Sequence, residues 1–169
     1  MKAYVLEGIG ELVYKDVPIP RLHEDEALVE VVNAGICGSD IPRIFETGTY
    51  HFPTIPGHEF AGVVRDVGGK EHADWLGKRV GVFPLIPCMQ CEQCKKKNYE
   101  MCQAYNYLGS RTDGGFAEYA AVPVWNLIPA GNEPSGCLQT FGDCRVGHIP
   151  RSSAALQVGC PSACCGVVD

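Results

Sequence analysis

Four cysteines in one short stretch constrain the fold of this sequence more than any other feature. Cys88, Cys91, Cys94 and Cys102 follow the spacing C-x2-C-x2-C-x7-C. Two-residue gaps let a tight loop aim three sulfurs inward, and the longer gap lets the chain return with the fourth, which completes the tetrahedral donor set of structural zinc. Because such a site has no open position, its zinc stabilises the fold rather than taking part in chemistry. The spacing therefore predicts a zinc-binding lobe.

Two alternatives to zinc remain open for the four cysteines. The first is an iron–sulfur cluster, since C-x2-C-x2-C also begins ferredoxin-type motifs, but those continue with three residues, a cysteine and a proline. Here the gap is seven residues and Gln103 follows the last cysteine. The second alternative is a set of four unrelated thiols in a reducing compartment. Of these possibilities, we predict zinc.

Charge and hydropathy argue against a role on nucleic acid or in a membrane. The 169 residues carry 14 basic and 20 acidic side chains, a net charge of −6, whereas nucleic-acid binding usually needs a basic surface. No apolar run approaches the roughly 20 residues that span a bilayer, and the apolar stretch before Glu7 is too short for a signal peptide. We therefore expect a cytoplasmic protein that binds neither nucleic acid nor membrane.

Cysteines and aromatic residues divide the chain near residue 130. Five of the ten cysteines lie in the last 39 residues, whereas Phe141 is the only aromatic residue beyond residue 130. We expect one globular domain over residues 1–130 and an atypical, cysteine-rich tail over residues 131–169. A shifted or truncated reading frame, a cloning artefact and a diverged tail would each account for that change of composition.

The first 130 residues are predicted to be mainly β. Short segments rich in strand-forming residues alternate with Gly and Pro turns, a pattern typical of a sandwich or barrel. Ser39 and Asp40 begin a short helix that continues to Phe45. The expected strands are residues 3–6, 12–16, 26–33, 59–67, 79–83, 116–122 and 124–128.

A second group of possible metal ligands lies on two separate segments. Cys37 stands in the turn Gly-Ile-Cys-Gly-Ser-Asp, and His58 stands between Gly57 and Glu59. A buried thiol and a hydrogen-bonded ring are the default interpretation of such a pair. However, both residues lie in glycine-containing turns at strand ends, and a catalytic zinc needs few protein ligands because it keeps one position open. They are therefore candidate ligands of a catalytic zinc.

The order of these motifs resembles the zinc-dependent medium-chain alcohol dehydrogenases, and within them the polyol, or sorbitol-type, branch. The stretches that carry the resemblance are CGSDIPRIF from Cys37, GHEFAG from Gly57, the four-cysteine lobe, and LGSRTDGGFAEY from Leu108. It covers residues 1–129. The resemblance implies a GroES-like, partly open β-barrel with a zinc-binding lobe. It also implies an enzyme that oxidises a secondary alcohol of a polyol, or of a polyol phosphate, by hydride transfer to NAD(P), and it is compatible with a homo-oligomer.

The resemblance implies a role for each residue of the second group. Cys37 and His58 would be ligands of the catalytic zinc, with Glu59 a further ligand or a carboxylate close to it. Asp40 would orient His58 by accepting its free ring N–H; the alternative is an exposed acid in the first helical turn. Ser39 would relay the proton of the substrate hydroxyl, cap the helix, or do both.

A phosphate on the polyol would need a cation near this group. Arg43 and Arg111, which lie in two of the resembling stretches, are the candidates. The run Lys95–Lys97 inside the four-cysteine motif is interpreted as a solvated loop rather than an anion site.

The resemblance also implies a nicotinamide-binding Rossmann domain, for which this sequence has no motif. Such a domain begins with a G-x-G-x-x-G turn between a strand and a helix, and none occurs here. One βαβ unit alone takes about 30 residues or more. We therefore expect no Rossmann domain in this chain, and no NAD-linked oxidation of a polyol by the chain alone. The alternative function is a non-enzymatic, zinc-stabilised β domain that has kept the fold and lost the chemistry.

Overall fold

The computed structural model describes residues 1–130, which form a mainly β domain, as predicted. The strands are β1 (Lys2–Gly8), β2 (Glu11–Asp16), β3 (Glu26–Gly35), β4 (Glu59–Val67), β5 (Arg79–Val82), β6 (Leu85–Ile86), β7 (Asn106–Tyr107), β8 (Tyr119–Pro123) and β9 (Leu127–Pro129). The helices are α1 (Asp40–Phe45), α2 (Glu92–Lys95) and three short 3₁₀ segments, η1 (Lys70–Trp75), η2 (Tyr99–Met101) and η3 (Val124–Asn126). The predictions about residues 131–169 lie outside the described residues.

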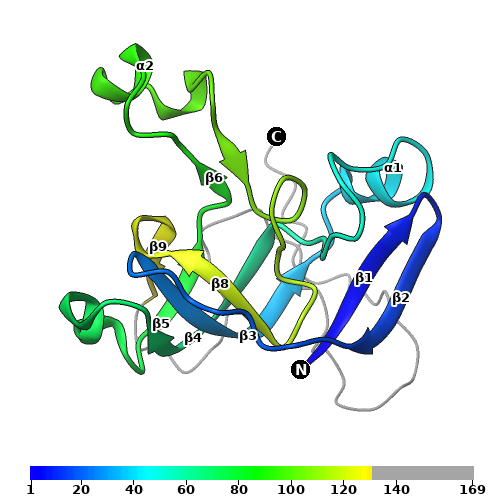
Figure 1. Ribbon diagram of the computed structural model, residues 1–169, viewed down its shortest axis with the longest axis horizontal. Coiled ribbons are helices and arrows are strands. Elements are labelled where there is room, and N and C mark those ends of the chain that lie inside the picture. The colour runs from blue at the N-terminus through cyan, green and yellow to red at the C-terminus, as the bar shows by residue number, and fades with distance from the viewer. Residues whose placement is uncertain (131–169) are drawn as a thin grey trace, which may run out of the picture.

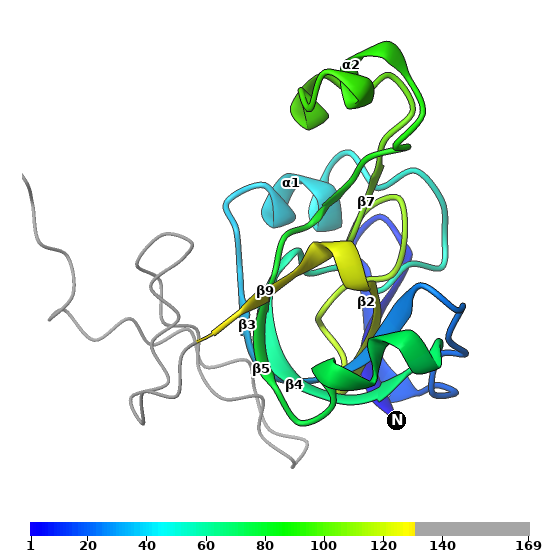
Figure 2. The same ribbon diagram turned by 90° about the vertical axis from the view of Figure 1, so that its left-hand side faces the viewer.

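A five-stranded antiparallel sheet in the order β8-β3-β4-β5-β9 forms the main layer of the domain. The sheet is strongly curved, as Figure 2 shows. Alternate residues of β3, such as Ala27 and Val29, point into the core and are fully buried. The pairing of β3 with β4 is close at Gly62, where a Cβ atom would lie 1.9 Å from the carbonyl oxygen of Glu30. Glycine is therefore required at that position.

The β1–β2 hairpin lies beside the main sheet and closes a second, smaller core (Figure 1). Two isolated bridges attach β1 to the rest of the domain, Ala3 to Ala117 and Leu6 to Thr54. Ala3 and Ala117 also contribute to the small core. Together, the curved sheet and the attached hairpin give the partly open, GroES-like architecture that the family resemblance implied.

Two strand predictions near residue 120 are wrong in their bounds. The strand expected at residues 116–122 begins only at Tyr119, because Phe116 bonds through its backbone to Tyr4 and Pro56 instead of to β3. Residues 124–126 form the 3₁₀ segment η3 rather than a strand. The side chain of Asn126 explains this turn, since it is buried and donates to the carbonyl oxygens of Phe83 and Leu85 at 2.6 and 2.8 Å. Short polar side chains that bond to the backbone in this way compete with regular pairing.

The four-cysteine motif forms a lobe that projects away from the sheet, at the top of Figure 1. Strands β6 and β7 pair antiparallel at its base, with Leu85 opposite Tyr107. The chain between them makes α2 and η2. None of the helices in residues 1–130 has the length and apolar character needed to cross a membrane.

Candidate metal centres

The four cysteine thiols of the lobe converge on one point. Their sulfur atoms all lie within 4.8 Å of one another, and the Cys88–Cys94 and Cys91–Cys102 Sγ pairs are each 4.0 Å apart. All four are free thiols. Zn–S bonds of about 2.3 Å in a tetrahedron place the sulfurs about 3.8 Å apart. The lobe is therefore consistent with one structural zinc, as the spacing predicted.

The backbone of the lobe prepares its thiols unequally for metal binding. A left-handed residue between the first two cysteines, Met89 with φ 60°, closes the tight turn, and α2 then places Cys94 one helical turn after Cys91. Backbone N–H groups of Cys94 and Gln103 lower the pKa of Cys91 to about 6. Burial raises the pKa of Cys94 to about 12. Since a thiolate is the form that binds zinc, the lowered pKa of Cys91 favours binding, whereas a metal at this site has to displace the proton of Cys94.

The second group of candidate ligands is assembled by strand pairing. Strand β3 ends at Gly35 and β4 begins at Glu59, and these two residues are cross-strand partners. The pairing therefore brings the turn after β3, with Cys37, next to the residues that begin β4. The donor atoms of Cys37, His58 and Glu59 all lie within 4.8 Å of one another. A thiol, an imidazole and a carboxylate at such separations are a suitable donor set for zinc.

A buried carboxylate supports this group from behind. Asp40 is completely inaccessible to solvent. Its Oδ2 accepts the backbone N–H of Cys37 at 2.9 Å, and its Oδ1 accepts from Arg43 Nη1 at 3.0 Å. Oδ1 also lies 3.2 Å from Nδ1 of His58, although the two groups are not aligned as in a strong hydrogen bond. The alternative of an exposed first-turn acid is wrong, because the turn between β3 and α1 folds the carboxylate inward.

The contacts of Asp40 fix the electrostatics of the second group. The carboxylate raises the pKa of His58, whose side chain is buried, although burial opposes this shift. Among residues 1–130, Nδ1 of His58 has no hydrogen-bond partner, and its ion-pair contact is with Asp40 Oδ1 at 3.2 Å. The ring can therefore present its other nitrogen, Nε2, to a metal while Nδ1 stays against Asp40, the arrangement common for histidine ligands.

Ser39 does not cap the helix, and its hydroxyl lies beside the thiol of Cys37. It occupies the position before α1, but its side chain makes no capping hydrogen bond. Its Oγ instead donates to Sγ of Cys37 at 3.4 Å. This hydrogen bond is the main reason why the pKa of Cys37 is lowered. The exposed hydroxyl thus faces the candidate ligand group and solvent at once.

One residue beside this group had no signal in the sequence. The ring of Tyr107 lies 5.8 Å from the ring of His58, centroid to centroid. Its position follows from the pairing of Tyr107 with Leu85 at the base of the lobe. Burial raises the pKa of Tyr107, which therefore stays neutral. Only the three-dimensional path of the chain through the lobe reveals this neighbour.

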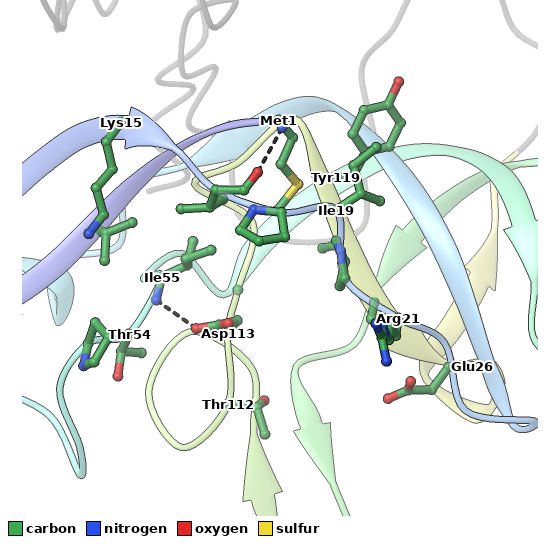
Figure 3. A pocket seen from close by; sticks show the side chains of 18 residues that line it. Met1, Lys15, Ile19, Arg21, Glu26, Thr54, Ile55, Thr112, Asp113 and Tyr119 are labelled. Atoms are coloured by element: carbon green, nitrogen blue, oxygen red, sulfur yellow. Dashed lines mark hydrogen bonds between the residues drawn. The ribbon is translucent and has the colours of Figure 1, made fainter.

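A separate hollow of about 630 Å³ lies between the hairpin, the segment after β2 and residues 112–114 (Figure 3). Its lining includes Met1, Lys15 and Arg21, and none of the candidate metal ligands. Within it, Asp113 accepts the backbone N–H of Ile55 at 2.8 Å. This carboxylate therefore supports the loop that precedes Gly57 and His58.

Comparison with known protein families gives a match over most of the described residues. The family described as "Alcohol dehydrogenase GroES-like domain" matches residues 23–132. Galactitol 1-phosphate 5-dehydrogenase of Escherichia coli (strain K12) is 42% identical over 129 residues, which cover 76% of this chain and 37% of that protein. Sorbitol dehydrogenase of Bacillus subtilis (strain 168) is 36% identical over 176 aligned positions, covering 99% of this chain and 49% of that protein.

Solved structures agree with these sequence matches. The crystal structure of galactitol-1-phosphate dehydrogenase from Escherichia coli superposes with a TM-score of 0.72 at 38% identity, over 79% of this chain and 39% of that chain. A cobalt- and zinc-bound thermostable alcohol dehydrogenase from Pyrobaculum aerophilum superposes with a TM-score of 0.72 at 32% identity, over 77% of this chain and 41% of that chain. The chain thus spans between about a third and a half of the length of these relatives.

Proposed function

The chain belongs to the zinc-dependent medium-chain alcohol dehydrogenases through its GroES-like domain, and we propose that residues 1–130 are the zinc-binding catalytic domain of a polyol dehydrogenase. The reaction would be the oxidation of a secondary alcohol by hydride transfer to NAD(P). The relatives named for galactitol 1-phosphate and for sorbitol both act on polyols, which supports this substrate class.

The observation that carries the proposal is the convergence of Cys37, His58 and Glu59 on one point, with Asp40 behind them. The lobe alone would be expected of any zinc-stabilised domain. A second donor set of mixed chemistry, which leaves room for a further ligand, is typical of a catalytic zinc site. The unpartnered Nδ1 of His58 and the fully buried Asp40 fit a ring held for metal binding rather than a ring packed in a core.

A zinc ion held by Cys37, His58 and Glu59 would supply Lewis acidity that lowers the pKa of a substrate hydroxyl toward neutrality. The residues of this chain perform the remaining tasks. Asp40 orients the imidazole and, through the backbone N–H of Cys37, fixes the turn that carries the thiol. The exposed hydroxyl of Ser39 accepts the proton that leaves the substrate and passes it to solvent, since a hydroxyl both donates and accepts.

The nicotinamide cofactor has no site of the Rossmann type in residues 1–130. Every pair of named strands there is antiparallel, whereas a Rossmann unit requires parallel strands joined by a helix. Because residues 1–130 do not provide this cofactor site, a second candidate function is a zinc-stabilised β domain without enzymatic activity. The two functions differ in their metal content, because only the dehydrogenase domain needs the second zinc.

Zinc analysis of the purified chain tests the proposal. We expect between one and two zinc ions per chain, with the more tightly held ion in the lobe, because four thiolates close that site. Replacing the second zinc by Co²⁺ should give visible d–d absorption of a mixed sulfur, nitrogen and oxygen site. Loss of that absorption in His58→Asn, with the lobe ion retained, is the result that the proposal requires.

His72→Asn is the matched control, since His72 is a partly buried histidine of η1 outside both donor sets. It should retain both metals. Iron in place of zinc, or a second site whose occupancy does not change in His58→Asn, would exclude the dehydrogenase domain. A single, lobe-bound zinc with Cys37 and His58 metal-free at saturating Zn²⁺ would favour the non-enzymatic domain.

A further inference from the structure

Arg111 is held in an unusual position for a surface arginine. Its guanidinium lies against the faces of two tyrosine rings, with Cζ 4.0 Å from the ring centroid of Tyr50 and 4.5 Å from that of Tyr105. Its Nε is buried and has no hydrogen-bond partner. Contact with two aromatic faces holds a guanidinium in place and leaves its charge intact.

No carboxylate among residues 1–130 forms an ion pair with Arg111. The nearest acid in the sequence, Asp113, is directed to the backbone N–H of Ile55 instead (Figure 3). Arg43, the other arginine that the sequence offered for a phosphate, is different: it is bonded to the buried Asp40 and only a fifth of its side chain is exposed. Of the two candidates, Arg111 is the one whose charge no carboxylate of residues 1–130 compensates.

Arg111 belongs to the turn that begins beside the second metal centre. The backbone N–H of Arg111 donates to the carbonyl oxygen of Tyr107 at 2.9 Å, and the ring of Tyr107 faces His58. The same turn packs directly on the residue before His58, since a Cβ atom on Gly109 would lie 2.6 Å from the carbonyl oxygen of Gly57. A ligand of several carbons could therefore contact both the metal centre and this turn.

We propose that Arg111, clamped by Tyr50 and Tyr105, binds the phosphate of a phosphorylated polyol whose hydroxyl is directed to the second metal centre. The inference rests on the proposed function and narrows its substrate class from polyols to polyol phosphates. A planar guanidinium recognises a phosphate through two parallel hydrogen bonds. The two tyrosines pre-orient it, so that little side-chain freedom is lost on binding.

Binding to the zinc-loaded chain tests the proposal without requiring turnover. The probes are galactitol 1-phosphate, galactitol and inorganic phosphate, and the readouts are calorimetric affinity and the ¹⁵N–¹H resonances of the arginine side chains. We expect galactitol 1-phosphate to bind more tightly than either other probe and to shift the resonances of Arg111. In Arg111→Gln, the affinity for galactitol 1-phosphate should fall by about ten-fold or more, whereas that for galactitol should not change.

Lys78→Gln is the matched control, because Lys78 also lies over an aromatic ring, that of Trp75 at 5.2 Å, but belongs to the segment between η1 and β5. It should bind galactitol 1-phosphate as the unchanged chain does. If Arg111→Gln does not fold, the titration of the unchanged chain decides, and Arg111→Lys should retain part of the affinity because lysine keeps the charge.

Three results would overturn the proposal: resonances of Arg111 that do not move, an equal loss of affinity for galactitol in Arg111→Gln, or inorganic phosphate binding as tightly as galactitol 1-phosphate. Each of these can occur in a chain that holds both zinc ions. Failure of this inference is therefore distinguishable from failure of the proposed function, which the metal analysis decides.

Discussion

Replacing Asp40 by asparagine should destabilise the domain by about 2–4 kcal/mol. The carboxylate is fully buried and pairs with Arg43, whose side chain is only 20% exposed. Removing one partner of a buried ion pair costs about 3–5 kcal/mol, because the other charge is left buried without compensation. Asparagine still offers an oxygen to the backbone N–H of Cys37, and that bond retains about 1 kcal/mol of the total. Asp40→Ala should lose this contribution as well.

Denaturant unfolding of the zinc-loaded protein measures this cost. Asp16→Asn is the control, since Asp16 pairs with Lys2 on the surface, where 75% of the carboxylate side chain is exposed, and such pairs contribute at most about 1 kcal/mol. A double substitution, Asp40→Asn with Arg43→Met, removes both charges. It should be less destabilised than the sum of its two single variants by about 1–3 kcal/mol.

The same substitution should weaken the second zinc site and leave the lobe unaffected. Groups that orient a metal-bound histidine typically contribute about 10- to 100-fold in metal affinity. We expect a loss of that size for Co²⁺ or Zn²⁺ at the Cys37 and His58 site in Asp40→Asn. The reasoning is refuted if Asp40→Asn and Asp16→Asn have the same stability within error, or if the second metal binds with unchanged affinity.

Three further predictions concern the backbone and the thiols. Gly57→Ala should cost about 2–4 kcal/mol of stability, since φ is +93° and a Cβ atom would lie 2.4 Å from the Phe116 ring. Gly77→Ala is the control: φ there is +74°, but a Cβ atom would meet nothing within 4 Å, so it should cost about 1 kcal/mol. Thermal unfolding of the two variants checks this difference, and equal shifts would contradict it. In the zinc-free protein at pH 7, iodoacetamide should modify Cys91 faster than Cys94, because their pKa values are about 6 and about 12. Peptide mass spectrometry gives the two rates, and a faster reaction at Cys94 would contradict the account of the lobe. Removing the lobe zinc should raise the rate of amide hydrogen exchange across residues 87–103 and leave the amides of the β3–β4 pairing protected. Faster exchange in both regions would contradict this, because it would show that the sheet depends on the lobe.

The sequence determined the parts of this protein that depend on local spacing. The intervals between the four cysteines are short enough that one loop can bring all four sulfurs together, so the lobe could be predicted without knowing the rest of the fold. Strands such as Glu26–Gly35 and Glu59–Val67 were predictable for a similar reason, since the alternation or the content of apolar residues within a segment is a local property. The motif order around these segments was specific enough to indicate the family.

Tertiary structure decided how separate segments come to share a site, since the family resemblance had grouped Cys37 with His58 without the strand pairing that joins them. Cys37 and His58 meet because β3 and β4 pair with Gly35 opposite Glu59, a non-local contact that neither segment encodes by itself. The same is true of Tyr107, which the base of the lobe places beside His58, and of η3, where the buried side chain of Asn126 replaces strand pairing. Arg43 and Arg111 were equivalent candidates in the sequence. Only the packed structure separates them: the buried Asp40 neutralises one charge, whereas the other is held between two tyrosine rings and pairs with no acid of the described domain.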